Sequence, residues 1–170
     1  RFRLDILAFH NKAIILKQKD KLTDIEIQKQ IRHLSGKNIS AKARWQLYNA
    51  AGVYFSTVSD FSKSNGYFGK ATKLFSENSF LLNDEMHQYL FSLYLQSATS
   101  FNLKNYPSTL STLKLLGNSF STMQNIEEKK NMLELYLYSL LLESITHMEL
   151  GEFTKAFPVV SKLNKIMETH

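Results

Sequence analysis

The hydrophobic residues recur at intervals of three and four along nearly the whole chain, which is the spacing of one face of an α-helix. No period-2 run of β-branched residues bounded by turn dipeptides, the pattern typical of strands, is found in the sequence. We therefore predict an all-α fold of eight helices. Because the connections between them are short, sequential helices are expected to be antiparallel and to form four helical hairpins.

Capping signals predict where several helices begin. Thr23 with Glu26, and Asn125 with Glu128, have the spacing of a capping box, in which each side chain satisfies a free backbone N–H of the other residue. These pairs are predicted to open the second and the seventh helix, and Ser40 is predicted to cap the third. The first helix is expected over about residues 1–18.

Glycine and proline predict where helices end or bend. Gly36 and Gly151 are expected to stop the second and the seventh helix, and Asn65–Gly66 is predicted to turn the chain from the third helix into the fourth. Pro107 fits the first turn of the sixth helix, which tolerates a missing N–H. Pro158 lies inside the eighth helix and is expected to bend or break it.

Regular apolar stripes predict which helix faces are buried. Two stripes are the clearest: Leu47, Ala51, Tyr54, Val58 and Phe61 on the third helix, and Phe153, Ala156, Val160, Leu163 and Met167 on the eighth. The fifth helix, over about 80–103, and the seventh, over about 125–150, are apolar nearly all round, so we expect them to be covered on several sides. Trp45 and Tyr48 are predicted to be core or hairpin contacts.

Three helix–turn–helix junctions share one local pattern. An aromatic residue follows the turn, a small residue comes three positions later, and a large apolar residue comes four positions after that. These positions hold Phe153, Ala156 and Val160, then Tyr106, Thr109 and Leu113, then Phe68, Ala71 and Phe75. The aromatic residue fills the space between the two helices of the hairpin, and the small residue lets these helices approach. The large apolar residue contacts the next repeat.

Over about residues 45–170 this pattern resembles the tetratricopeptide repeat. The resemblance implies a right-handed α-solenoid of about four hairpins in a single domain over 1–170. The hairpins would be 40–78, 80–119 and 125–169, preceded by 1–36 as a divergent hairpin or a cap. The sequence departs from the family in its aromatic spacings of 38 and 47 residues, against about 34. Its first helices of roughly 22–26 residues are also longer than the family's. A generic irregular helical array is the alternative.

In this family the first helices of successive repeats line a concave groove. Carried over to this chain, the resemblance directs seven side chains toward that groove: Phe91, Tyr94, Phe101, Tyr138, Leu141, Ile145 and Met148. We expect an aromatic-rich groove that takes an amphipathic helix or hydrophobic peptide of a partner. The alternative is that these side chains pack among the repeats or are covered by other parts of the chain.

The composition is that of a folded protein, with 44% hydrophobic and 21% charged residues in a chain of 170. The net charge of +6 is uneven, because residues 1–44 hold 11 Lys and Arg against four acids. A basic end is typical of proteins that bind nucleic acid, an anionic membrane or an acidic partner. Here the charges are dispersed and not interleaved with aromatic residues, which favours a solvated helix surface over nucleic-acid binding.

The sequence contains few signs of chemistry. There is no cysteine, no phosphate-binding glycine loop, no Gly-x-Ser-x-Gly and no His-Glu-x-x-His. Glu143 and His147 lie one helical turn apart, but two ligands are too few for a metal site, so we predict a hydrogen-bonded pair. No catalytic, cofactor-binding or metal-ligating residue is predicted, and the chain is not expected to be an enzyme.

The expected function is that of a protein–protein interaction module or scaffold, whose partner is another protein, a peptide or another domain of the same chain. The alternative is the sensor or linker part of a bacterial signalling or transcription regulator, whose nucleic-acid-binding domain lies outside this segment. The chain begins at Arg1 without an initiator methionine, so we expect a segment of a longer protein. No signal peptide is recognised, and the longest uncharged stretch, 86–103, is too polar to span a bilayer. We therefore expect a cytoplasmic location.

Overall fold

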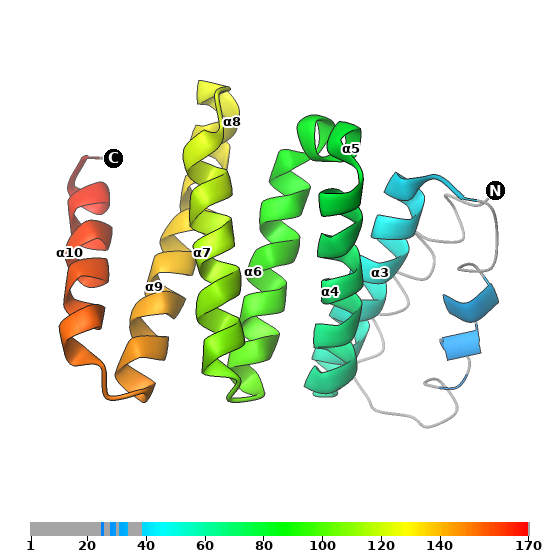
Figure 1. The fold of residues 1–170 in the computed structure, drawn as a ribbon, viewed down its shortest axis with the longest axis horizontal. Coiled ribbons are helices and arrows are strands. Elements are labelled where there is room, and N and C mark those ends of the chain that lie inside the picture. Colours follow the sequence, from blue (N-terminus) through cyan, green and yellow to red (C-terminus); the bar gives the residue numbers. More distant parts are fainter. Residues whose placement is uncertain (1–24, 26–27, 30, 34–38, 170) are drawn as a thin grey trace. The chain divides into compact units, whose positions relative to one another are not determined.

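The computed structural model describes residues 25, 28–29, 31–33 and 39–169, and these residues are largely helical (Figure 1). No strand occurs among them, so the predicted all-α class is confirmed for the described chain. None of the described helices has the length and apolar character needed to cross a membrane. The chain divides into two compact units, Arg1–Met86 and His87–His170. The helix predicted over 1–18, the Thr23–Glu26 capping box and Gly36 lie outside the described residues.

Three helical hairpins of identical dimensions make up most of the described chain. In each, a first helix of 17 residues is joined by a three-residue turn to a second helix of 17 residues. The hairpins are α3 (Ala41–Thr57) with α4 (Phe61–Glu77), α6 (Met86–Asn102) with α7 (Tyr106–Thr122), and α9 (Leu133–Glu149) with α10 (Phe153–Thr169). Two six-residue helices, α5 (Ser79–Asp84) and α8 (Ile126–Asn131), precede the second and the third hairpin.

The three connecting turns have the same backbone conformation. Their middle residues are left-handed, with φ of 61° at Ser59, 57° at Lys104 and 72° at Gly151. In each turn the next backbone N–H donates to the carbonyl five residues earlier, at 2.8 to 2.9 Å. A left-handed residue of this kind commonly ends a helix, and here it reverses the chain at the same point of every hairpin.

The shared turn leads to a prediction about its middle residue. Glycine is favoured there because it has no Cβ to clash in the left-handed conformation. We expect Gly151→Ala to lower the free energy of unfolding by about 1 kcal/mol, and Lys104→Gly to raise it by about 0.5 to 1 kcal/mol. Denaturant titration of both variants measures the two changes. A less stable Lys104→Gly variant would contradict the common turn geometry.

Side chains cap several helices where the sequence predicts it. The Oγ of Ser40 accepts a hydrogen bond from the backbone N–H of Ala43 at 3.2 Å, and Oδ1 of Asn125 accepts one from that of Glu128 at 3.1 Å. Pro107 lies in the first turn of α7. The cap at Ser40 and the place of Pro107 are confirmed. Of the predicted capping box, the hydrogen bond to the Asn125 side chain is confirmed, but Asn125 opens the short helix α8 and not the long helix that follows it.

The turn predicted at Asn65–Gly66 is wrong, because both residues lie inside α4. The chain reverses earlier, at the left-handed residue Ser59. The side chain of Asp60 then caps α4 by accepting a hydrogen bond from the backbone N–H of Lys63 at 3.2 Å. The first helix of this hairpin is therefore shorter, and the second longer, than the sequence predicts.

This correction makes the repeat more regular. Phe61, and not Phe68, occupies the position that Tyr106 and Phe153 hold at the start of the other second helices. The spacings between these aromatic residues become 45 and 47 in place of 38 and 47. The small residue three positions later is buried in all three hairpins, as Ser64, Thr109 and Ala156.

The long first helices predicted for the second and third hairpins are also wrong. The segment 80–103 contains α5 and α6, which are separated at Glu85, and the segment 125–150 contains α8 and α9, which are separated at Met132. The periodicity continues across both breaks, so the pattern alone does not locate them. α10 continues through Pro158 as one helix, which excludes the predicted alternative of a break.

In the first unit, the predicted stripe of α3 packs into the core. Four of its five members, Leu47, Ala51, Tyr54 and Val58, are at most 6% exposed, and Ile31 joins their cluster. The fifth, Phe61, begins α4 and is half-buried, so its predicted place on this stripe is wrong. The ring of Trp45 meets that of Phe75 edge-on at a centroid distance of 6.0 Å, and the ring of Tyr48 lies 6.3 Å from that of Tyr67. The predicted core and hairpin roles of Trp45 and Tyr48 are thus confirmed.

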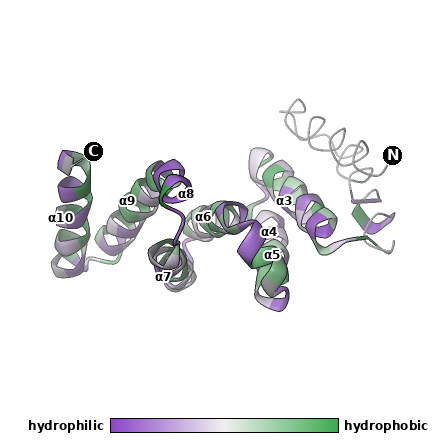
Figure 2. Ribbon diagram, turned by 90° about the horizontal axis from the view of Figure 1, so that it is seen from above, coloured by the Kyte–Doolittle hydropathy of each residue, from purple (hydrophilic) through white to green (hydrophobic). Residues whose placement is uncertain are grey.

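In the second unit, α9 lies between α7 and α10 (Figure 2). Toward α7, the ring of Tyr136 stacks on that of Phe120 at a centroid distance of 4.2 Å. The predicted stripe of α10 is buried only in part. Ala156 is 5% exposed, whereas Phe153 and Met167 are 68% and 60% exposed. One flank of α10 therefore packs on α9 while another apolar flank faces solvent.

Candidate functional site

The seven side chains predicted to line a groove lie on α6 and α9, the first helices of the two hairpins in the second unit. We call them the α6–α9 face: Phe91, Tyr94 and Phe101 of α6, and Tyr138, Leu141, Ile145 and Met148 of α9. Positions 91 and 138, 94 and 141, and 101 and 148 are equivalent, because each pair is 47 residues apart, like the helices themselves. The same positions of two successive repeats thus supply the face.

Four of the seven side chains are exposed. Phe91, Tyr138, Leu141 and Met148 each expose between 44% and 48% of their surface. The remaining three, Tyr94, Phe101 and Ile145, are half-buried. Isolated exposed apolar residues are common on protein surfaces, but a contiguous group on adjacent helices is typical of a binding surface.

Ring contacts hold the α6–α9 face together. The ring of Tyr94 lies 6.5 Å from that of Tyr138, which joins the two helices. The Tyr138 hydroxyl donates to Oε1 of Glu134 at 3.0 Å, and this hydrogen bond to a carboxylate raises the pKa of Tyr138. Phe101 packs against Tyr106 of α7 at a centroid distance of 5.6 Å. Phe101 is therefore as much a contact within its hairpin as a member of the face.

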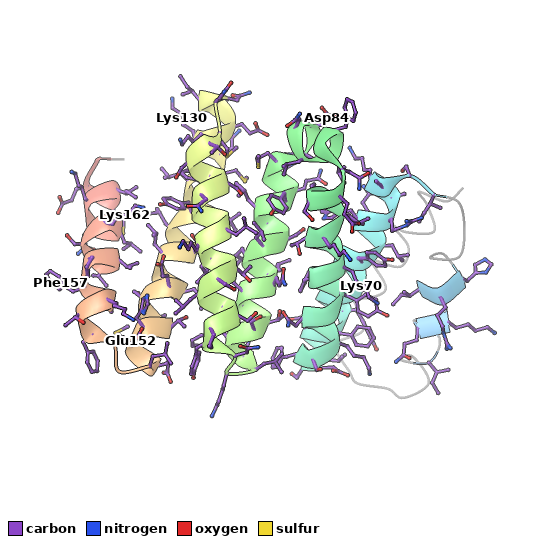
Figure 3. The ribbon with its side chains drawn as sticks, in the orientation of Figure 1. Lys70, Asp84, Lys130, Glu152, Phe157 and Lys162 are labelled. Atoms are coloured by element: carbon purple, nitrogen blue, oxygen red, sulfur yellow. The ribbon has the colours of Figure 1, made fainter. Side chains whose placement is uncertain are left out.

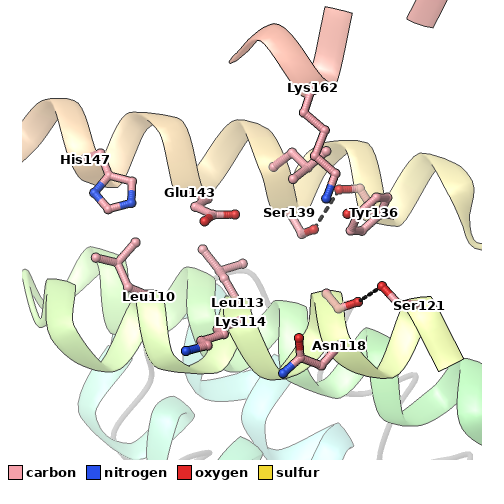
Figure 4. A pocket seen from close by; sticks show the side chains of 12 residues that line it. Leu110, Leu113, Lys114, Asn118, Ser121, Tyr136, Ser139, Glu143, His147 and Lys162 are labelled. Carbon is pink, nitrogen blue, oxygen red and sulfur yellow. Dashed lines mark hydrogen bonds between the residues drawn. The ribbon is translucent and has the colours of Figure 1, made fainter. Parts of the chain in front are cut away.

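A hollow of about 420 Å³ lies between α7 and α9, and α10 contributes one side chain to it (Figure 4). We call it the α7–α9 groove. Its lining comprises Leu110, Leu113, Lys114, Gly117, Asn118 and Ser121 of α7, Tyr136, Ser139, Leu140, Glu143 and His147 of α9, and Lys162 of α10. This groove was not predicted from the sequence. Its one signal in the sequence is that Ser139, Glu143 and His147 recur every four residues along the same helix.

Two of the charged side chains at the α7–α9 groove, His147 and Lys162, have partners within the fold. Nδ1 of His147 lies 2.8 Å from Oε2 of Glu152, so the partner of this imidazole is Glu152 and not the predicted Glu143. Hydrogen bonds from Lys155 and from His147 lower the pKa of Glu152. Lys162 places its Nζ 5.2 Å from the centre of the Tyr136 ring, a cation–π contact that ties α10 to α9.

Glu143 is a half-buried carboxyl group in the α7–α9 groove. Burial raises its pKa, and the charges of His147 and Lys162 oppose this change only in part. The folded chain therefore holds the Glu143 proton more tightly than the unfolded chain does, so ionisation weakens the fold. Among the described residues, no group of three or more His, Asp or Glu side chains is arranged to hold a metal ion.

The raised pKa of Glu143 leads to a pH-dependent prediction. At pH 7 the Glu143→Gln variant should unfold about 1 to 2 °C above the unchanged chain, a small gain because water screens a half-exposed carboxylate. The gain should shrink as the pH falls through the raised pKa of the folded chain and disappear below the ordinary glutamate pKa, where the carboxyl is protonated in both states. Thermal unfolding followed by circular dichroism measures this difference at each pH. A gain that stays constant with pH would exclude ionisation as its cause.

Comparison with known proteins assigns no family to this chain. No protein-family model, no curated protein and no solved structure matches it. Of the α6–α9 face and the α7–α9 groove, only the face was predicted from the sequence pattern, and four of its seven side chains are exposed.

Proposed function

We propose that this chain is a tetratricopeptide-like interaction module, a right-handed solenoid of helical hairpins, that binds an amphipathic helix or hydrophobic peptide of a protein partner on the α6–α9 face. The equal hairpins support this proposal, because 17-residue helices and identical left-handed turns recur three times. Repeats of this kind contact mainly their neighbours and present extended surfaces to partners.

The observation that carries the proposal is the exposure of Phe91, Tyr138, Leu141 and Met148 on two successive first helices, with Phe91 and Tyr138 at equivalent positions. No acidic or basic side chain other than His87 occurs along α6. Glu134 and Glu149 lie near the two ends of α9, and its central acid, Glu143, lines the α7–α9 groove. The centre of the face is thus apolar, which suits a ligand helix whose apolar residues recur at i, i+3 or i+4, and i+7.

Selection of binders from a phage-displayed library of helical peptides tests the proposal. Peptides that bind the full chain should carry that apolar spacing. Tyr138→Asp and Leu141→Asp, made separately, should weaken their binding by about tenfold or more, because each places a charge against the apolar ligand. Isothermal titration calorimetry measures the affinities, and circular dichroism checks that each variant is folded.

The matched control is Phe80→Asp on α5, which is 85% exposed and lies outside the face. Peptide affinity should be unchanged in this variant. If the selected peptides bind the Tyr138→Asp and Leu141→Asp variants as tightly as the unchanged chain, they occupy another surface and the proposed site is wrong.

A further inference from the structure

The outer flank of α10 is apolar and exposed. Phe157 is 76% exposed, and in Figure 3 its side chain points from α10 away from α9. Phe153 and Met167, on the same flank, are 68% and 60% exposed. A shallow hollow of about 500 Å³ lies on this flank. Burial of such side chains stabilises a helical array, so a flank of this kind is suited to a further contact.

The repeat shows which part of the fold this hollow corresponds to. α7 and α10 are equivalent second helices, offset by 47 residues. The wall that α7 contributes to the α7–α9 groove consists of Leu110, Leu113, Lys114, Gly117, Asn118 and Ser121. The hollow on α10 is lined by Phe157, Val160, Ser161, Asn164, Lys165 and Glu168. Each of these six positions lies 47 residues after its counterpart on α7.

Two apolar positions of this α7 flank are buried where α9 packs on it, whereas the polar positions Lys114, Asn118 and Ser121 stay exposed. Leu113 is 3% exposed and Phe120 is 7% exposed, whereas their equivalents Val160 and Met167 on α10 are 37% and 60% exposed. The α10 hollow is therefore one wall of a groove that, one repeat earlier, is completed by the first helix of the next hairpin.

We propose that the outer flank of α10 is a docking site for an amphipathic helix that packs on it as α9 packs on α7. The occupant carries an aromatic residue where α9 has Tyr136 and an aliphatic residue where α9 has Leu140. The aromatic ring would meet the thioether of Met167, the residue that takes the place of Phe120, and sulfur–aromatic contacts are favourable. This site is separate from the α6–α9 face.

A chain extended by one repeat tests the proposal. A second copy of residues 123–169 is placed directly after Thr169, so that the added helices follow α10 as α8, α9 and α10 follow α7. The natural sequence has no cysteine, so Phe157→Cys, made in the first copy only, introduces a single thiol. Its reaction with a maleimide should be at least about tenfold slower in the extended chain than in the parent chain, because the added helix covers it.

Ile126→Cys in the first copy is the matched control, because Ile126 is 74% exposed on α8 and away from the α10 flank. This thiol should react at the same rate in both chains. Equal rates for Phe157→Cys in the two chains would overturn the proposal, as would added residues that circular dichroism finds unfolded. Sedimentation that shows a dimer of the parent chain, lost in Phe157→Asp, would assign the flank to a second copy and overturn it as well.

Discussion

Replacing Gly52 with alanine should lower the free energy of unfolding by about 2 to 3 kcal/mol. A Cβ at this position would lie 2.7 to 2.8 Å from three atoms of the Phe68 ring, closer than side chains approach in folded proteins. Phe68 is fully buried, and the Oγ of Ser64 donates to the carbonyl of Gly52 at 2.8 Å, which holds α4 against α3. The ring has no room to move, so the two helices must separate. Denaturant titration measures the loss.

Gly66→Ala is the matched control for this substitution. Gly66 lies in the interior of α4, and a Cβ there would meet nothing within 4 Å. Alanine is the better helix former, so this variant should gain about 0.5 to 1 kcal/mol. Opposite signs in the two variants would locate the effect at the contact of Gly52 with Phe68. Equal stability of the Gly52→Ala variant and the unchanged chain would rule out so close an approach of α3 and α4.

The features of this fold that could be predicted from the sequence are local. The buried stripe of Leu47, Ala51 and Tyr54 follows from helical periodicity, because one face of a helix must leave water. The caps at Ser40 and Asn125 depend on side chains three residues or fewer from the N–H groups they satisfy. Such interactions need no knowledge of the rest of the chain.

The misplaced turn shows where local signals fail. Asn-Gly is typical of a turn, whereas nothing in the side chain of Ser59 requires a left-handed backbone. Tertiary contacts decide between the two sites. The Ser64 hydrogen bond to Gly52 and the burial of Phe68 require residues 65–66 to stay helical, so the chain has to reverse before them.

The candidate surfaces were only partly predictable for a similar reason. The pattern of α10 identifies an apolar stripe, but a stripe does not tell which of its residues a neighbouring helix covers, and only Ala156 is buried. The α7–α9 groove combines residues from three helices, so no spacing within one segment reveals it. Comparison of equivalent positions in successive repeats locates such surfaces more reliably than the spacing within one segment. The 47-residue offset relates the six positions on α7 to the six that line the hollow on α10.

Phe120→Ala is expected to cost about 3 kcal/mol or more of unfolding free energy. Phe120 is 7% exposed, and its ring lies almost parallel to that of Tyr136, at an interplanar angle of 10°. The Nζ of Lys129 lies 5.3 Å from the centre of the Phe120 ring, a cation–π contact. This one side chain thus joins α7 to α9, and its removal leaves a cavity between successive hairpins. Hydrogen exchange should accelerate more in α9 and α10 than in α6, because repeats are stabilised mainly by their neighbours.

Met167→Ala distinguishes this coupling from the general loss of a large side chain. Met167 is the equivalent of Phe120 one repeat later, but it is 60% exposed because no described helix covers it. Its replacement should change the free energy of unfolding by no more than about 0.5 kcal/mol. The loss of unfolding free energy at the two equivalent positions then differs because a helix packs on Phe120 and none packs on Met167. If both variants lost the same stability, the contact of α9 with α7 would not be the source of the effect, and the nearest-neighbour account of this chain would fail.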